Sequence, residues 1–342
     1  MRYQLLGKSG LRVSEVCLGT MTFGETWGWG ASKEASRQQF DLFAAAGGNF
    51  IDTSVNYTDG ASEEFLGEFL HAAGRDKFVV ATKYTLTRPD STDPNAGGNS
   101  RKNMRQSVER SLRRLRTDFI DVYYLHVWDY MTPVEEVMRG LDDLVQAGKV
   151  LYVAVSDSPA YIAAEANMLA ELRGWSRFIG LQIPYSLLNR AAERDLLPMA
   201  RRWEMAVLPW GILEAGVLTG KFMDKPSDAT RVNPEGLKLS EQAGAVVRAV
   251  HQIAQETGRP MSQVAINWVR QQPAAQIIPI LGARTAAQLQ DNLAALDWKL
   301  APEQWSRLDE ISRIELGFPH DFIPGNPYVY GATYNLIDNR RA

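Results

Sequence analysis

The sequence predicts an α/β fold, a closed (β/α)8 barrel of the TIM type with an N-terminal β-hairpin and long loops on the C-terminal rim. Two observations predict it. Eight short apolar segments of strand length recur along the chain, and helical stretches lie between many of them. Such alternation indicates parallel strands joined by crossover helices, and eight repeats favour a closed barrel over an open sheet.

The first expected element is a hairpin, because residues 3 to 16 alternate weakly around the turn signal Gly7-Lys8-Ser9-Gly10. The strand candidates that follow are Val16 to Gly19, Phe50 to Asp52, Phe78 to Thr82, Phe119 to Leu125, Val150 to Val155, Ile179 to Ile183, Ala206 to Pro209 and Gln276 to Ile280. The helical stretches are Lys33 to Ala46, Ser62 to His71, Arg101 to Arg116, Pro133 to Ala147 and Ala160 to Arg173. Pro133 suits the first turn of its helix.

Three connections are long enough to be functional loops: Tyr84 to Ser100, Gly211 to Ser240 and the tail from Glu315 to Ala342. No Ser/Gly-rich or Pro-rich linker divides the chain, so residues 1–342 are expected to form one domain. The tail is expected to cover the rim or an interface, and the oligomeric state stays open. Its aromatic residues are Phe318, Phe322, Tyr328, Tyr330 and Tyr334.

Composition is that of an ordinary globular protein, with 45% apolar residues and a formal net charge of -3 in 342 residues. This charge gives no field suited to nucleic acid or to an anionic membrane. The basic helix from Arg101 to Arg116 carries apolar residues at helical spacing (Met104, Val108, Leu112, Leu115) and is expected to be a solvated outer helix.

The single cysteine, Cys17, excludes an intrachain disulfide and a thiolate metal cluster, and its apolar neighbours predict a buried strand. No apolar run is long enough for a membrane span or a secretory signal. We therefore expect a cytoplasmic location, small-molecule partners and no metal.

Four polar residues follow strand candidates in the first half of the chain. Asp52 ends the second strand, Tyr57 follows it by a short turn, and Lys83 and His126 stand at the ends of the third and fourth. In a barrel all four would lie on one rim, where such folds carry out their chemistry. Each residue alone is more often structural than catalytic, but four together favour a catalytic site.

The chemistry of this set suits protonation of a developing alkoxide. A phenol is a weak acid, with a reference pKa of about 10, and a nearby ammonium such as that of Lys83 would lower the pKa of Tyr57. Asp52 would hold Lys83, and His126 would orient a carbonyl oxygen or share the proton with Tyr57. With no metal set and no cysteine pair, hydride from a nicotinamide is the expected source of electrons.

The segments around these residues resemble the aldo-keto reductases over nearly the whole chain. The matching motifs are Leu6 to Ser14, Leu18 to Met21, Asp52 to Tyr57 with Ser62-Glu63, Thr82-Lys83 and Leu125-His126. The resemblance implies a catalytic tetrad of Asp52, Tyr57, Lys83 and His126, with Tyr57 as the general acid in reduction. The aryl-alcohol dehydrogenase-like branch is the most similar, through Leu125 to Tyr130, Gly148 to Tyr152 and Val155 to Ala160.

The resemblance also implies NADP(H) as cofactor. The nicotinamide carboxamide would be held by Ser156, Asp157 and Gln182, with Trp210, followed by Gly211, stacked on the ring. The loop from Leu213 to Lys221 would cover the pyrophosphate through Gly216, Leu218 and Lys221. The adenosine-phosphate signature comprises Gly282, Arg284, Gln288, Asp291 and Asn292, and a guanidinium at Arg284 favours NADP over NAD.

Two positions depart from the family pattern. Asp157 stands where most members carry Asn, and a carboxylate can accept hydrogen bonds from the carboxamide but cannot donate to it as an amide does. Asp291 stands where Glu is more common, and its reach toward adenine is shorter.

The loops of the expected rim carry aromatic residues, namely Trp27, Trp29, Trp128 and Tyr130. An aromatic wall suits aryl or other hydrophobic aldehydes and ketones, reduced reversibly with NADPH. One alternative is an NADP-binding regulatory subunit of a membrane channel, with little turnover. Another is a lyase or isomerase that uses Lys83 as a Schiff base, which would leave Gln182, Trp210 and Arg284 unexplained.

Overall fold

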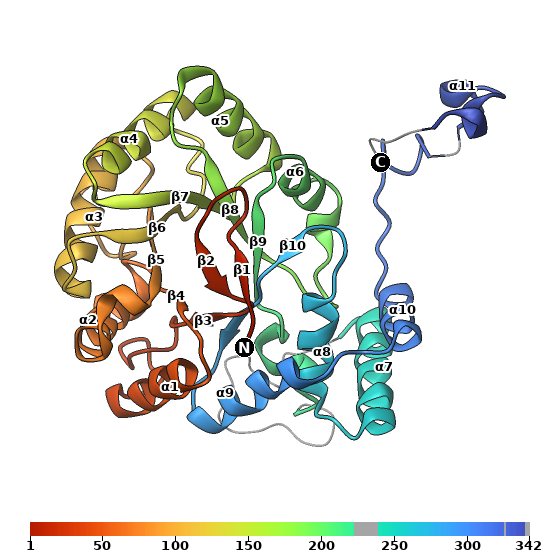
Figure 1. The fold of residues 1–342 in the computed structure, drawn as a ribbon, viewed down its shortest axis with the longest axis horizontal. Helices are drawn as coiled ribbons and strands as arrows, with labels where there is room; N and C mark the ends of the chain where they lie inside the picture. Colours follow the sequence, from red (N-terminus) through yellow and green to blue (C-terminus); the bar gives the residue numbers. More distant parts are fainter. Residues whose placement is uncertain (222–238, 325, 339–342) are drawn as a thin grey trace.

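A closed parallel barrel forms the body of the protein (Figure 1). The computed structural model describes residues 1–221, 239–324 and 326–338. Parallel strands pair in chain order from β3 to β9. They are β3 (Cys17–Gly19), β4 (Phe50–Asp52), β5 (Val79–Tyr84), β6 (Ile120–Leu125), β7 (Val150–Ser156), β8 (Phe178–Pro184) and β9 (Ala206–Trp210). The predicted (β/α)8 fold is confirmed, because an eighth barrel position joins β9 back to β3.

That eighth position is divided, whereas the sequence predicted one strand from Gln276 to Ile280. β10 (Gln276–Ile277) pairs with β9, and β11 (Ile280–Gly282) pairs with β3. Between them, the Ile278 amide donates to the Val207 carbonyl at 2.9 Å, and the Pro279 carbonyl accepts from the Cys17 amide at 2.9 Å. Proline has no amide hydrogen, so the ladder is interrupted where the chain passes from one neighbour to the other.

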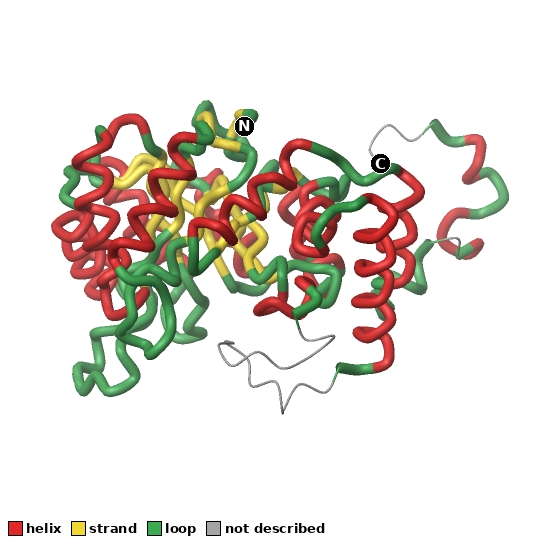
Figure 2. Tube along the Cα trace, turned by 90° about the horizontal axis from the view of Figure 1, so that it is seen from below, coloured by secondary structure: helices red, strands yellow, loops and turns green. Residues whose placement is uncertain are grey.

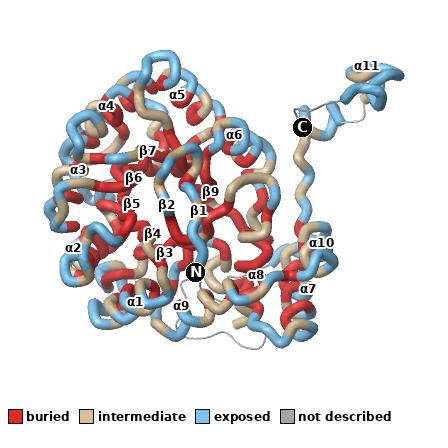
Figure 3. Tube along the Cα trace, in the orientation of Figure 1, coloured by how far each residue is buried: buried red, intermediate tan, exposed pale blue. Residues whose placement is uncertain are grey.

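Helices surround the barrel, with their buried faces inward and exposed faces outward (Figure 3). The helices are α1 (Lys33–Ala45), α2 (Ala61–Ala73), α3 (Arg101–Leu115), α4 (Val134–Gln146), α5 (Ala160–Arg173), α6 (Leu196–Arg202), α7 (Glu241–Thr257), α8 (Met261–Arg270), α9 (Ala286–Leu293), α10 (Pro302–Ile311) and α11 (Pro327–Tyr330). Short 3-10 turns are η1 (Tyr57–Gly60), η2 (Arg75–Lys77), η3 (Ala191–Glu193), η4 (Glu214–Thr219), η6 (Ala294–Asp297) and η7 (Tyr334–Leu336).

Most predicted helix bounds differ from these by one or two residues. Helix α3 buries its predicted apolar face, Met104, Val108, Leu112 and Leu115. Pro133 is the cap residue just before α4 and not part of its first turn, with ψ at 141°. Within the described ranges, no helix has the length and apolar character needed to cross a membrane.

The N-terminal hairpin closes one end of the barrel, and loops of the described part of the chain lie at the opposite end (Figure 2). β1 (Tyr3–Leu5) and β2 (Arg12–Ser14) pair antiparallel, as the sequence predicted. Leu6 and Val13 are fully buried and pack in one cluster with Cys17, which is itself buried as expected. Gly7 has φ +52°, and a Cβ there would lie 2.1 Å from the Ile179 carbonyl oxygen, so only glycine fits this turn.

Two predicted loops include residues outside the described part of the chain. Residues 222–238 of the Gly211 to Ser240 connection, and residues 325 and 339–342 of the tail, lie outside it. The described tail runs away from the barrel after α10, and α11 lies apart from the other helices (Figure 1). Phe318 and Tyr328 are exposed there, while Tyr330 packs on Tyr334 with ring centroids 4.1 Å apart.

Candidate active site

Lys83 is at the centre of the predicted tetrad, near the C-terminal end of β5. Its fully buried Nζ donates to Asp52 Oδ2 at 2.6 Å, to the Thr53 carbonyl at 2.8 Å and to the Tyr57 hydroxyl at 3.0 Å. All three ammonium hydrogens therefore have acceptors. Burial disfavours the charge, but the Asp52 carboxylate and the Tyr57 hydroxyl outweigh it, so the pKa of Lys83 is raised.

Asp52, the last residue of β4, is held from a second side. Gln182 on β8 donates from Nε2 to Asp52 Oδ1 at 2.9 Å, so each carboxylate oxygen has a partner. Gln182 thus reaches across the barrel to the predicted tetrad. Because Gln182 holds one oxygen of the Asp52 carboxylate, the other oxygen holds the ammonium of Lys83 in a fixed position.

Tyr57 opens a strained turn. Thr58 (φ 46°) and Asp59 (φ 58°) both adopt left-handed backbone conformations, which residues other than glycine rarely do. Thr58 Oγ1 holds the turn by donating to the Phe23 carbonyl at 2.6 Å. Backbone strain of this kind is found where the surroundings fix a functional geometry, and here it directs the phenol toward Lys83.

The pKa of Tyr57 shows why the sequence argument was incomplete. Burial raises the pKa of Tyr57, and the neighbouring Lys83 ammonium lowers it by less. The expected effect of Lys83 is present, but the net shift is upward because a phenolate in this site would be a buried charge. Tyr57 is therefore protonated at neutral pH, the form that can donate a proton.

His126 follows β6 and faces Tyr57 edge-on, with ring centroids 6.0 Å apart and planes at 78°. Its Nδ1 is 3.2 Å from the Ser54 hydroxyl, which also donates to Asn56 Oδ1 at 2.7 Å. Burial, helped by the Lys83 charge, lowers the pKa of His126 well below its usual value. The ring is therefore neutral at pH 7 and offers one N–H and one lone pair.

The predicted nicotinamide set lies at the same ends of the next strands. Ser156 ends β7 and Trp210 ends β9, on either side of Gln182 on β8. Among the described residues, the buried Ser156 hydroxyl has no hydrogen-bond partner, so it can bind an added polar group. Trp210 is 40% exposed although it ends a buried strand, as a stacking platform would be.

Asp157 supports that platform. Its carboxylate Oδ1 accepts from Trp210 Nε1 at 3.2 Å, and its backbone is left-handed with φ 38°. Burial raises the pKa of Asp157, and the bond from Trp210 opposes this rise. An asparagine would offer the same acceptor and tolerate the same backbone, so this contact accommodates the departure from the family pattern.

The predicted phosphate contacts come from two segments. Gly211, Leu213, Gly216 and Leu218 lie on or beside η4, and Gly282, Arg284, Gln288 and Asn292 lie on or before α9. Burial and the charge of Arg284 together lower the pKa of Lys221, which indicates that the two cations lie in one another's field. A lysine and an arginine near one another suit an anion, so the donor set fits the phosphates of NADP.

Asp291 has a further role that the sequence did not indicate. Its two oxygens accept from the Ser262 hydroxyl at 2.6 Å and from Gln263 Nε2 at 2.9 Å, both on α8. The carboxylate therefore ties α9 to α8. Nearby, Asn292 Nδ2 donates to the Gly282 carbonyl at 3.5 Å.

The four aromatic residues predicted to line the substrate pocket differ in burial. Trp27 and Trp29 are half-buried and pack on each other at 5.7 Å between ring centroids. Trp128 is buried in the hydrophobic core, and Tyr130 is 71% exposed with φ 57°. Tyr130 is thus the member of this set most open to solvent.

Sequence reasoning missed several residues that support the site. The Thr53 carbonyl and Ser54 lie inside the matching motif Asp52 to Tyr57, so the motif itself was the available signal. Arg114 of α3 contacts the Tyr57 turn through the Val55 carbonyl at 2.8 Å. Nothing distinguished it from the other arginines of that helix, which was interpreted as solvated.

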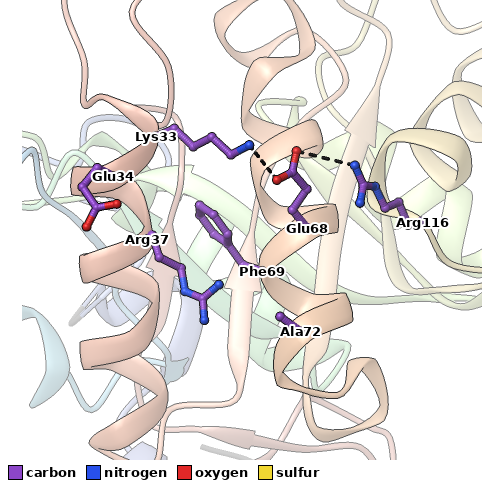
Figure 4. A pocket seen from close by; sticks show the side chains of 7 residues that line it. All are labelled: Lys33, Glu34, Arg37, Glu68, Phe69, Ala72 and Arg116. Atoms are coloured by element: carbon purple, nitrogen blue, oxygen red, sulfur yellow. Dashed lines mark ion pairs between the residues drawn. The ribbon is translucent and has the colours of Figure 1, made fainter.

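A hollow of about 590 Å³ lies on the outside of the barrel between α1 and α2 (Figure 4). Three of its charged groups pair with one another, since Glu68 bridges Lys33 at 2.6 Å and Arg116 at 3.5 Å, while Arg37 pairs with Asp41 at 2.8 Å. The lining residues are Lys33, Glu34, Arg37, Glu68, Phe69, Ala72 and Arg116. None of the predicted site residues belongs to it.

Comparisons with known proteins agree with the predicted resemblance. The model of the Aldo/keto reductase family matches residues 15–313. An aryl-alcohol dehydrogenase [NADP(+)] of Phanerodontia chrysosporium is 39% identical, over 98% of this chain and 90% of the relative. An aryl-alcohol dehydrogenase of Pestalotiopsis microspora is 36% identical, over 94% and 85%. The norsolorinic acid reductase stcV of Emericella nidulans is 36% identical, over 93% and 83%. With a family model over most of its length and relatives of this similarity, the chain belongs to the Aldo/keto reductase family.

Proposed function

We propose that this protein reduces aromatic or other hydrophobic aldehydes and ketones with NADPH, reversibly with the corresponding alcohols. Its broader class, an NADP-dependent oxidoreductase, follows from the family. The names of the relatives, aryl-alcohol dehydrogenases and a norsolorinic acid reductase, support an aromatic substrate. The observation that carries the proposal is the buried contact of 3.0 Å between Lys83 Nζ and the Tyr57 hydroxyl.

Tyr57 is the proton donor in this proposal. NADPH, when bound, would supply the hydride, and negative charge would then develop on the carbonyl oxygen of the substrate. The protonated phenol of Tyr57 gives its proton to that oxygen, and the ammonium of Lys83 stabilises the phenolate that remains. In alcohol oxidation the same pair works in reverse.

The remaining members of the tetrad hold this pair and the substrate. Asp52 keeps Lys83 charged and in place, at 2.6 Å from its Nζ, and Gln182 keeps Asp52 in place. For the neutral ring of His126 to donate to the carbonyl oxygen, its one N–H would lie on Nε2, and the Ser54 hydroxyl would then donate to Nδ1 instead of to Asn56. A substrate oxygen between Tyr57 and His126 would thus be oriented before the proton moves.

The cofactor residues have matching roles. Ser156, Asp157 and Gln182 would hold the carboxamide, with the face of Trp210 against the nicotinamide. The segment from Leu213 to Lys221 would cover the pyrophosphate. Arg284, whose charge helps to lower the pKa of Lys221, would pair with the 2′-phosphate and so favour NADP over NAD.

The test is loss of reduced-nicotinamide absorbance with NADPH or NADH and a panel of aromatic, aliphatic and sugar aldehydes, for wild type and Tyr57→Phe. We expect NADPH-preferring turnover of aromatic aldehydes, and a loss of roughly 10²- to 10⁴-fold in Tyr57→Phe while NADPH binding is retained. Undiminished turnover in Tyr57→Phe would contradict the mechanism. Tight NADPH binding by wild type without turnover of any aldehyde would favour a regulatory NADP-binding subunit.

A further inference from the structure

Arg114 of α3 reaches the turn that carries Tyr57 and contacts it on both sides. Its Nη1 donates to the Val55 carbonyl at 2.8 Å, and its Nη2 donates to the Asp59 carbonyl at 3.5 Å. Val55 precedes Tyr57 by two residues, and Asp59 follows it by two. One planar guanidinium therefore spans the segment whose middle residue bears the phenol.

The turn is built to admit this guanidinium. Gly60 has φ +101°, and a Cβ there would lie 2.2 Å from Arg114 Cζ. Glycine is thus required both by its backbone and by the arginine beside it. Because Thr58 and Asp59 are left-handed, the turn needs contacts from outside to keep its shape.

Glu63 of α2 links the same arginine to the strand of Lys83. Its fully buried carboxylate approaches Arg114 Nη1 with Oε2 at 3.3 Å and accepts from Thr82 Oγ1 with Oε1 at 2.7 Å. Thr82 directly precedes Lys83 on β5. The chain of contacts therefore runs from the carbonyls around Tyr57, through Arg114 and Glu63, to the residue next to Lys83.

We propose that Arg114 and Glu63 are positioning residues that set the distance between the Tyr57 hydroxyl and Lys83 Nζ. This inference rests on the proposed role of Tyr57 as the general acid. Among the described residues, neither side chain forms a hydrogen bond or ion pair with a tetrad side chain, and both act through the backbone of the Tyr57 turn and through Thr82. Loss of either lets the phenol move away from the ammonium, and proton transfer slows because its geometry is lost.

A second buried ion pair supplies a matched control. Arg75 Nη2 lies 2.6 Å from Asp121 Oδ2, and Asp121 also accepts from the Val80 amide at 2.9 Å. Arg75 donates to the Phe78 carbonyl at 2.9 Å, so this pair also joins backbone to carboxylate. It lies at the N-terminal ends of β5 and β6, the end of a barrel that serves stability.

The experiment compares Arg114→Met with Arg75→Met for kcat and KM with an aromatic aldehyde, NADPH Kd by fluorescence titration, and Tm. We expect Arg114→Met to lower kcat about 10- to 100-fold, with NADPH Kd within about twofold of wild type. Arg75→Met lowers Tm but keeps kcat within about twofold at a temperature where both variants are folded. Arg114→Lys recovers part of the loss, because an ammonium can still bond one of the two carbonyls. Unchanged kcat in folded Arg114→Met overturns the inference.

A double-variant cycle separates positioning from general damage. Adding Arg114→Met to Tyr57→Phe is expected to leave the residual turnover of Tyr57→Phe unchanged, because the group being positioned is already gone. A further loss of the same 10- to 100-fold would show that Arg114 acts independently of Tyr57 and would overturn the inference. If Arg114→Met does not fold, the same cycle is carried out with Glu63→Gln. We expect Glu63→Gln to lower kcat several-fold in the protein that retains Tyr57 and to leave the turnover of Tyr57→Phe unchanged.

Different results would reject the role of Tyr57 as the acid and the positioning role of Arg114. Full activity in Tyr57→Phe would reject Tyr57 as the acid and the inference with it. An inactive Tyr57→Phe beside a fully active, folded Arg114→Met would reject the positioning role alone.

Discussion

His126 is 7% exposed and lies in the field of an ammonium, and both features disfavour its protonated form. Its pKa in the folded protein is therefore well below the value of about 6.5 that an unfolded chain would have. Between these two values the unfolded state binds more protons, so the free energy of unfolding rises with pH there. Stability from this residue is complete above about pH 6.5 and is lost as the pH falls toward the folded pKa.

His126→Gln tests this linkage, because glutamine does not titrate. We expect the free energy of unfolding of wild type to fall by about 1.4 kcal/mol per pH unit below pH 6.5, relative to the variant. Urea unfolding of both proteins at pH 7.5, 6.5 and 5.5 gives this difference. Parallel dependence on pH in the two proteins would mean that His126 stays charged or exposed.

The sequence predicted which residues meet in the site better than it predicted their pKa values. Asp52, Tyr57 and Lys83 were expected to meet because barrel strands end on one rim, and hydrogen bonds of 2.6 and 3.0 Å join them. The rise in the pKa of Tyr57 depends on burial from every side, which no local pattern contains. Arg114 was missed for the same reason, since its contacts come from a turn far from it in sequence.

Among the elements, strand and helix positions followed from periodicity, but pairing did not. The segment from Gln276 to Ile280 is apolar and was predicted as one strand, while its two halves pair with different neighbours around Pro279. A proline in the predicted strand was the available signal, because proline interrupts a ladder. The barrel still closes because each half completes the pairing of one neighbour.

The contact between α2 and α3 depends on Gly67. A Cβ at this position would lie 2.1 Å from the Arg114 carbonyl oxygen and 3.0 Å from Leu115 Cα, both backbone atoms that cannot move cheaply. Glycine inside a helix normally costs about 1 kcal/mol relative to alanine. Here we expect the opposite sign, with Gly67→Ala lowering the free energy of unfolding by about 1–3 kcal/mol through overpacking.

Gly244 in α7 is the matched control. Within the part of the chain that the structure describes, its added Cβ would meet only Arg248 Nη1, at 3.3 Å, and that atom ends a flexible side chain. Gly244→Ala is therefore expected to raise the free energy of unfolding by up to about 1 kcal/mol. Urea denaturation of both variants checks the pair, and a stabilising Gly67→Ala would show that the helices separate to admit a methyl group.

In the whole molecule, the two ends of the barrel bury different kinds of side chain. The hairpin buries Leu6 and Val13 against one end, while the buried polar groups around Lys83 gather at the other. The sequence predicted a hairpin and a rim that gathers polar residues, but it did not predict that the two lie at opposite ends of the barrel. The tail was expected to cover the rim or an interface, and its described part runs away from the barrel after α10 with Phe318 and Tyr328 exposed (Figure 1).

Helix α10, the last helix before the tail, is tied to the barrel by Arg190, which is buried in the loop after β8. Its Nη1 donates to the Asp309 carbonyl at 2.6 Å and to the Ser312 hydroxyl at 2.8 Å. Its Nη2 lies 2.8 Å from Asp309 Oδ1, and its Nε lies 2.7 Å from Glu193 Oε1. One guanidinium therefore satisfies two carboxylates and two further acceptors across a long sequence separation.

Removal of this charge would leave Glu193 and Asp309 facing each other in a largely buried site. We expect Arg190→Met to lower the free energy of unfolding by about 3–5 kcal/mol, the cost of breaking a buried pair from one side. Arg194→Met is the control: among the described residues, the exposed Arg194 side chain bonds only the Glu315 carbonyl, at 3.0 Å, so its loss should cost less than about 1 kcal/mol. Urea unfolding measures both. Equal, small losses in the two variants would mean that α10 is held by its apolar face, and that the Arg190 network contributes little because desolvation of its charges offsets their attraction.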